Sequence, residues 1–211
     1  MATKLRTIVY IDGFNLYYGA VKGTPHKWLN LEKFFRMVRP LDDVQRVRYF
    51  TAQITGPTRP NQDAFLRALA TLPTVDITLG AFKETSIPCE HTGCPIQHTG
   101  PHRFKVQREK MTDVNIATAM FEDAFLNRCD QLILVSGDSD LVGAVKAVRR
   151  LFPAKRVVVY VPSRHANRGF VELQAAASKA SLLPLNLLHR AQFPISLADG
   201  SGGTINKPSS W

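Results

Sequence analysis

Short β-branched runs alternate with amphipathic stretches along most of this 211-residue chain. The runs, which are rich in Val, Ile and aromatic residues, lie at 6–13, 44–52, 75–82, 131–136 and 156–162. Segments with apolar residues three and four apart lie at 30–38, 60–72, 112–128, 140–152 and 168–178, and a short edge strand is expected at 181–188. The later runs are apolar throughout, as in parallel strands covered on both faces. The alternation therefore predicts an α/β sandwich with a mainly parallel sheet.

The length of the chain suits one well-packed domain, which we expect to cover 1–190. Within this domain, 83–107 is rich in Pro, Gly, Thr, Cys and His and has no hydrophobic periodicity. That composition predicts a long inserted loop. The last residues, 191–211, end in DGSGGTINKPSSW, which is typical of a flexible tail.

The chain has 27 Lys and Arg against 17 Asp and Glu, a formal net charge of +10. This balance indicates a polyanionic partner, namely nucleic acid, a phosphorylated ligand or an anionic membrane, although many small proteins are simply basic. No apolar run approaches the ~18 residues of a spanning helix, and no basic amphipathic helix stands out, so we expect no membrane partner. An odd number of cysteines and the lack of a recognisable signal peptide favour a reducing compartment, the cytoplasm.

Four aspartates stand where predicted strands end or helices begin. Asp12 follows the first predicted strand, and Asp138 and Asp140 follow the fourth. Asp113 begins the helix that leads into the fourth strand. In open parallel sheets the ligand site lies beyond the carboxyl ends of the strands, where the strand order reverses. If the first and fourth strands are neighbours, all four carboxylates converge in one crevice.

Such a convergence is unfavourable without a cation. Two carboxylates about 4–5 Å apart repel each other by roughly 3–4 kcal/mol at an effective dielectric constant near 20. A hard divalent cation such as Mg²⁺ or Mn²⁺ prefers oxygen ligands and reverses the sign of this interaction. The alternative is that Asp113 and Asp140, which precede or open helices, only cap them. The matched positions of all four favour a metal site.

Three segments resemble motifs of a known family. YIDGFNLYYG, REKMTDVNIATAM and LILVSGDSDLVGAV, in this order, resemble the NYN domain, the LabA-like branch of the PIN-like nucleases, over about residues 6–183. The resemblance implies a PIN-like three-layer α/β/α sandwich and metal-dependent hydrolysis of RNA phosphodiesters. It also implies that Asp12, Asp113, Asp138 and Asp140 are the acidic metal-site residues, with Asn15 as a supporting polar residue and Ser136 as the hydroxyl that orders the turn.

Basic residues precede Asp113 in the sequence. The inserted segment runs into Arg103, Lys105, Arg108 and Lys110, and we expect these residues to hold a substrate phosphate backbone. The resemblance places Lys110 near a phosphate. Arg164, after the fifth strand, is a further phosphate-binding candidate, although a plain surface charge explains it as well.

The inserted segment contains Cys89, Cys94, His98 and His102, in an order that is compatible with a tetrahedral structural Zn²⁺ site. Thiolates and imidazoles are poor Mg²⁺ ligands, so this site would be separate from the acidic one. The alternative is a reduced polar loop whose histidines contact solvent or substrate.

The sequence as a whole predicts a metal-dependent ribonuclease that acts on single-stranded or structured RNA. Two alternatives stay open: a nuclease directed at DNA or at structured junctions, and an interaction module that binds nucleic acid or protein without turnover.

Overall fold

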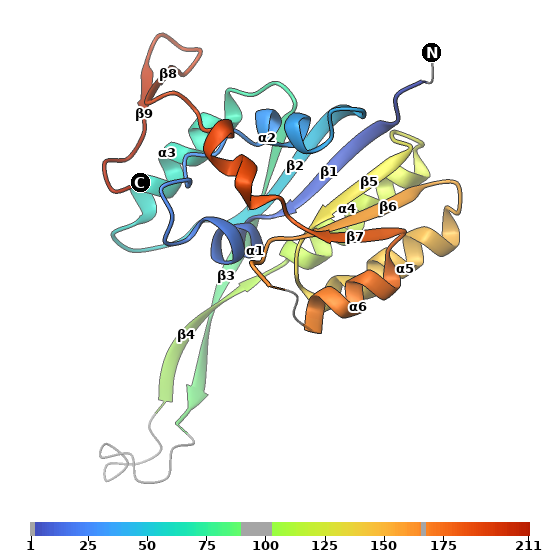
Figure 1. Cartoon of the computed structure of the whole chain (residues 1–211). Coiled ribbons are helices and arrows are strands. Elements are labelled where there is room, and N and C mark those ends of the chain that lie inside the picture. Colours follow the sequence, from blue (N-terminus) through green and yellow to red (C-terminus); the bar gives the residue numbers. More distant parts are fainter. Residues whose placement is uncertain (1–2, 90–102, 166–167) are drawn as a thin grey trace.

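The computed structural model describes residues 3–89, 103–165 and 168–211, and its centre is a seven-stranded sheet (Figure 1). The strands are β1 (Arg6–Asp12), β2 (Asp43–Ala52), β3 (Val75–Pro88), β4 (Arg103–Lys110), β5 (Gln131–Val135), β6 (Arg156–Val161) and β7 (Lys179–Leu182). Their order in the sheet is β4-β3-β2-β1-β5-β6-β7. All neighbouring strands are parallel except β3 and β4. The predicted mainly parallel α/β fold is confirmed.

Helices cover both faces of the sheet, because the central strand presents apolar side chains to each. In β1, Ile8 and Tyr10 point into one core and Val9 and Ile11 into the other, as the two-residue period of a strand requires. The first core is closed by α4 (Thr112–Phe125), α5 (Val142–Leu151) and α6 (Arg168–Ala176). The second is closed by α1 (Gly13–Leu16), the π-helix η1 (Tyr17–Val21), α2 (Leu31–Val38), α3 (Arg59–Ala70) and the 3-10 helix η4 (Leu185–Ala191). The result is a three-layer α/β/α sandwich.

The strand order reverses at β1. From β1 the chain builds β2 and β3 on one side, and after the β3–β4 ribbon it returns to build β5, β6 and β7 on the other. Val9 pairs with Ile133, so β1 and β5 are neighbours, as the sequence reading required. The ligand-binding position of such a sheet is therefore the edge where α1 follows β1 and the short 3-10 helix η3 (Ser139–Leu141) follows β5.

The prediction of a loop over 83–107 was wrong for its described parts. Strand β3 continues to Pro88, and β4 begins at Arg103, with Ile87 opposite Phe104 in an antiparallel ribbon. The ribbon projects from the sheet (Figure 1). None of the ribbon residues over 81–88 and 103–110 is fully buried, so this part of the chain lacks the apolar face that signals a strand in a sequence.

The prediction of a flexible tail over 191–211 was also wrong. This segment contains the two-stranded hairpin of β8 (Ser196–Ala198) and β9 (Thr204–Asn206), in which Ile205 is only 2% exposed. The ring of Trp211 lies 6.2 Å from that of Trp28 and 5.7 Å from that of Phe65. The few apolar residues of this Gly- and Ser-rich segment thus pack it against the rest of the protein. The expected edge strand over 181–188 is β7, which lies at 179–182 and is followed by η4.

None of the described helices has the length and apolar content needed to cross a membrane.

Replacing Trp211 with Ala should lower the free energy of unfolding by about 2 kcal/mol, because it removes a partly buried aromatic ring from the Trp28–Phe65 cluster. Urea denaturation followed by circular dichroism measures the change. The matched control is Ile195→Ala, whose side chain is 76% exposed and which should change stability by less than about 0.5 kcal/mol. Equal stabilities of the two variants would mean that the C-terminal segment does not contribute to the fold.

Candidate metal centre

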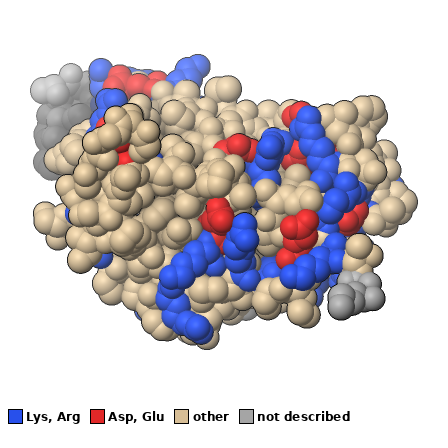
Figure 2. Space-filling model, turned by 90° about the horizontal axis from the view of Figure 1, so that it is seen from above, with Lys and Arg blue, Asp and Glu red and all other residues tan. Residues whose placement is uncertain are grey.

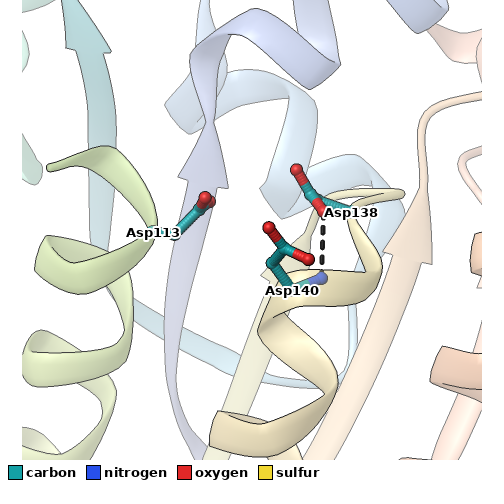
Figure 3. A group of neighbouring side chains, drawn as sticks. All are labelled: Asp113, Asp138 and Asp140. Atoms are coloured by element: carbon teal, nitrogen blue, oxygen red, sulfur yellow. Dashed lines mark hydrogen bonds between the residues drawn. The ribbon is translucent and has the colours of Figure 1, made fainter. Parts of the chain in front are cut away.

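Three of the four predicted aspartates form one cluster at the switch point of the sheet (Figure 3). Asp138 and Asp140 come from the turn after β5, and Asp113 comes from the first turn of α4. One carboxylate oxygen of each lies within 4.8 Å of the others. Asp113 and Asp138 are half-buried, and Asp140 is exposed. The cluster is thus open to solvent on one side and supported by protein on the other.

The turn that carries Asp138 is held by side-chain hydrogen bonds. The Ser136 hydroxyl accepts a hydrogen bond from the backbone N–H of Asp138 at 3.0 Å. The Asp138 carboxylate in turn accepts one from the N–H of Asp140 at 2.9 Å and so caps η3. A side chain at Gly137 would lie 3.2 Å from the Val161 side chain, which would have to shift slightly to accept it. The predicted role of Ser136 in ordering the turn agrees with this geometry.

Asp12 stands behind the cluster and outside the group of three. Asp12 is only 4% exposed, and its carboxylate caps α1 by accepting a hydrogen bond from the N–H of Asn15 at 2.9 Å. Its other oxygen accepts bonds from the Asn15 amide at 2.6 Å and the Ser136 hydroxyl at 3.1 Å. Burial raises the pKa of Asp12, and these hydrogen bonds oppose the rise. The four-carboxylate convergence expected from the sequence is therefore three carboxylates with a fourth fixed beside them.

Asp113 has the most perturbed carboxylate of the cluster. Burial first, and then the nearby charges, raise its pKa to about 6; these charges are Asp138, Asp12, Glu109 and Asp140. The helix start that presents Asp113 is shaped by Met111, a non-glycine residue with a φ of 83°. Glu109 accepts hydrogen bonds from the backbone N–H and the hydroxyl of Thr112 and so serves the first turn in place of a cap residue.

Helix capping accounts for only part of the acidic cluster. Asp12 and Asp138 do cap, but the carboxylates of Asp113 and Asp140 accept no hydrogen bond from any residue that the structure describes. Their repulsion is unbalanced by the protein alone. Three carboxylates form an all-oxygen donor set, which suits Mg²⁺ or Mn²⁺ and is a poor match for softer metals. The donor set therefore fits the hard divalent cation expected from the sequence.

The predicted phosphate-binding residues lie along β4 and beyond β6. Arg103 donates hydrogen bonds to the hydroxyl and carbonyl oxygens of Ser86, and Lys105 forms an exposed ion pair with Glu84 at 2.9 Å. Arg108 and Lys110 are exposed and form no ion pair with a described acid, and Arg164 is exposed after β6.

Basic residues are also abundant at the amino ends of the strands, where Lys and Arg alternate with Asp and Glu (Figure 2). There Arg6 pairs with Asp130 at 2.7 Å, and Arg39 pairs with Asp42 at 2.6 Å. Part of the positive charge on that face is therefore paired with acidic residues of the protein. On the strand that leads to the acidic cluster, Arg108 and Lys110 are not compensated in this way.

The expected zinc site falls mostly on residues outside the described part of the chain. Cys94, His98 and His102 lie outside the described residues, while Cys89, just after β3, is a free and partly exposed thiol. The zinc site stays a prediction. Cys129 is buried, and burial raises its pKa to about 11, which agrees with a plain core residue.

Three residues near the cluster did not follow from the sequence reading as site residues. Glu109 acts on Asp113 through its charge, while Phe14 and Tyr18 present aromatic rings beside Asn15. The signal for the aromatic pair was the segment FNLYYG (14–19), which begins two residues after Asp12. Aromatic residues after a strand read as core residues, and only the structure separates the 62% exposed Tyr18 from the buried ones.

An open α/β sandwich with an acidic cluster at its switch point is a hydrolase-like or ligand-binding architecture, and the comparison with family models gives its class. The NYN domain model matches residues 6–183. The chain therefore belongs to the NYN domain family, whose fold is PIN-like.

One relative of this chain is named for a different activity. The chain is 28% identical over 194 residues to 6-hydroxy-3-succinoylpyridine 3-monooxygenase HspA from Pseudomonas putida (strain DSM 28022 / S16). The match spans 78% of this chain but only 62% of that protein. Among solved structures, VPA0982, a protein of unknown function from Vibrio parahaemolyticus RIMD 2210633, aligns with a TM-score of 0.54 and 20% identity. It covers 87% of this chain and 96% of its own, and it supports the fold alone.

The cluster predicts a pH-dependent response to metal. Without metal, the raised pKa of Asp113 contributes stability that is present below pH about 4 and lost as pH rises through about 6, because the folded state holds the proton more tightly. That proton also competes with a cation. We expect Mn²⁺ at about 100 times its Kd to raise Tm by about 5–10 °C above pH about 7, and by much less below pH about 5.

Thermal unfolding with and without Mn²⁺ across this pH range measures the effect. Asp138→Asn is the matched variant, because Asn keeps a cap oxygen for the N–H of Asp140 but removes a charge from the cluster. It should abolish most of the Mn²⁺ response at every pH. A response that persists in this variant, or that is independent of pH, would place the metal elsewhere.

Proposed function

We propose that this protein is a metal-dependent ribonuclease that hydrolyses RNA phosphodiester bonds. The observation that carries the proposal is the group of three carboxylates within 4.8 Å of one another at the switch point of an NYN-family sheet. A solvent-open acidic site next to uncompensated basic residues suits a polyanion that is neutralised partly by protein cations and partly by a metal ion.

Asp113, Asp138 and Asp140 would hold the cation, Mg²⁺ or Mn²⁺. A bound ion of this kind supplies Lewis acidity toward a phosphate oxygen and lowers the pKa of a water molecule. Asp12 adds a fixed negative charge behind the cluster, and its bonds to Asn15 and Ser136 keep the two loops of the site together. This support holds the carboxylates in place before substrate arrives, which reduces the cost of ordering them.

The β3–β4 ribbon would hold the RNA backbone. Arg108 and Lys110 lie on β4, whose end leads directly into the helix of Asp113. Arg103 and Lys105 continue the basic series toward the tip of the ribbon, and Arg164 lies after β6. Charges in this arrangement attract either RNA or DNA, so the choice of RNA rests on the family, and DNA is the alternative substrate.

The name of the Pseudomonas putida relative suggests a second candidate activity, oxygenation of a pyridine ring. The carboxylate-only cluster favours hydrolysis, because oxygen activation by iron or copper uses histidine or thiolate ligands more often than three carboxylates. The match covers only 62% of that relative, so the activity of the whole relative cannot be assigned to this chain. We also propose a reducing location such as the cytoplasm, since Cys89 and Cys129 are both free.

The first test is cleavage of an end-labelled single-stranded RNA. We expect products with Mn²⁺ or Mg²⁺ and none with EDTA, and Asp138→Asn should lower kcat/KM at least about 100-fold, because it removes a cation ligand. Asp43→Asn is the matched control, an exposed aspartate at the amino end of β2, and it should keep full activity.

Three results would contradict the proposal. Cleavage of DNA but not RNA would change the substrate, and binding without cleavage of either would identify an interaction module. Oxygen-dependent conversion of 6-hydroxy-3-succinoylpyridine, in the absence of any nuclease activity, would favour the relative's activity.

The ribbon predicts a salt dependence that can be measured separately. Arg108→Ala and Lys110→Ala should each weaken RNA binding and reduce the slope of log K against log salt by about 1, the loss of one phosphate contact. Fluorescence anisotropy in EDTA measures binding without turnover. Lys33→Ala, an exposed residue of α2, is the control and should leave the slope unchanged. Equal slopes for all three variants would exclude the ribbon from the RNA interface.

A further inference from the structure

A pocket of about 260 Å³ lies directly beside the acidic cluster. One wall is Phe14 and Tyr18, from α1 and the π-helix η1. The opposite wall is Val161, Pro162 and Ser163, at the carboxyl end of β6, and Gly137 lies at its base. The pocket is therefore built from loops at the same edge of the sheet as the acids.

The aromatic wall presents ring surface that the fold does not need. The rings of Phe14 and Tyr18 are stacked, with centroids 6.4 Å apart and planes inclined by 20°. Tyr18 is 62% exposed, so its ring contributes little to the core. The Lys22 ammonium lies 4.7 Å from the centre of the Tyr18 ring. An exposed, electron-rich ring beside a cation is the combination with which proteins hold single-stranded nucleic acid.

The backbone geometry fixes this wall in place. A side chain at Gly19 would lie only 1.7 Å from the carbonyl oxygen of Pro162, so η1 packs closely against the end of β6. Wide π-helical turns are rare and are found frequently at functional sites. Here the turn over 17–21 sets the direction in which Tyr18 points.

The pocket and the acidic cluster share a wall through Asn15. The Asn15 side chain accepts a hydrogen bond from the N–H of Gly137 at 3.0 Å and donates one to Asp12 at 2.6 Å. Asp138 is the next residue after Gly137. A ligand in the pocket is therefore separated from the carboxylates by a single side chain and one residue of backbone.

We propose that this pocket holds one unstacked nucleobase of the RNA strand, next to the phosphate at the acidic cluster. The inference rests on the proposed function for its substrate class and adds the place where a base is bound. The ring of the base stacks on Tyr18, while the Lys22 ammonium neutralises the backbone at the pocket mouth. Neither the stacking on Tyr18 nor the contact of Lys22 depends on which base is bound, since every base has a planar face.

The polar groups of the pocket provide little sequence readout. The Ser163 hydroxyl donates to the carbonyl oxygen of His165 at 2.7 Å and accepts from its N–H at 3.3 Å. The Asn15 side chain is already hydrogen-bonded to Gly137 and Asp12. With these groups already paired inside the protein, stacking rather than hydrogen bonding decides affinity, so we expect purines to be favoured modestly over pyrimidines.

The test is binding of a short oligoribonucleotide to the full chain in EDTA and low salt, so that no strand is cut. We expect Tyr18→Ala to weaken binding about five- to 150-fold, the range measured for loss of one base–aromatic stack. Tyr18→Phe keeps the ring and should stay within about twofold of the wild type. The matched control is Phe125→Ala, a 76% exposed aromatic at the far end of α4, which should also stay within about twofold.

A second readout locates the base. With 2-aminopurine placed at one position of the oligonucleotide at a time, one position should be quenched more than the others by the wild type and by Tyr18→Phe, but not by Tyr18→Ala. An abasic residue at that same position should reproduce the loss seen with Tyr18→Ala.

Three outcomes would overturn the inference: Tyr18→Ala binding within twofold of the wild type, uniform quenching along the strand, or adenosine alone binding as tightly as the oligonucleotide, which would make the site a small-molecule pocket. These outcomes are independent of hydrolysis. Loss of affinity in Tyr18→Ala without any cleavage supports the pocket and contradicts the nuclease, whereas cleavage that Tyr18→Ala leaves unchanged does the reverse.

Discussion

Mutual repulsion among carboxylates at the β1–β5 edge is the constraint around which this structure is arranged. Asp113, Asp138 and Asp140 meet with no ion pair to a Lys or Arg among the residues that the structure describes, and Asp12 is buried nearby. Carboxylates this close would move apart if their side chains were free, so the surrounding residues must hold them in place. Burial first, and then the neighbouring carboxylates, raise the pKa of Asp113, so the charged form of this side chain is disfavoured without a metal ion.

The support for this charge comes from short, neutral contacts. Ser136 and Asn15 together bind the turn after β5 to the start of α1, using one hydroxyl and one amide. Neither group adds charge, and both use their hydrogen-bonding capacity within the protein. Because hydrogen bonds support the site from the protein side and Asp140 is exposed to solvent, metal and substrate can exchange without rearrangement of the carboxylates. The same Asn15 also separates the acids from the aromatic pocket, so the two features share one support.

The family and the activity of this protein depend on different parts of the chain. The fold and the family follow from nearly the whole length of the domain, whereas chemistry depends on a few side chains that a fold can exchange. The relative from Pseudomonas putida, 28% identical, carries the name of a monooxygenase. In this chain the carboxylate cluster and the uncompensated Arg108 and Lys110 are the groups that favour hydrolysis of a polyanion.

The sequence by itself determined the α/β class, most of the helices and strands, and the positions of the acids, because each is a local signal. A buried strand such as 131–135 is apolar over successive residues, and the helix after Asn30 shows both its cap and its apolar stripe. The metal hypothesis came from the positions of Asp12, Asp113, Asp138 and Asp140 relative to the predicted strands and helices, and from the resemblance to the NYN domain. Local patterns were reliable wherever one face of an element is buried.

Only the tertiary structure decided how distant segments meet. The pairing of β1 with β5 brought Asp12 beside Ser136, yet the hydrogen bonds of Asp12 kept it out of the group of three. The β3–β4 ribbon has no buried face, and the C-terminal segment is held through Trp211 by residues far away in the sequence, so neither left a periodic signal. The exposure of Tyr18 likewise depends on the packing of η1 against Pro162. Periodicity reports which side of an element is covered, but it does not report what covers it.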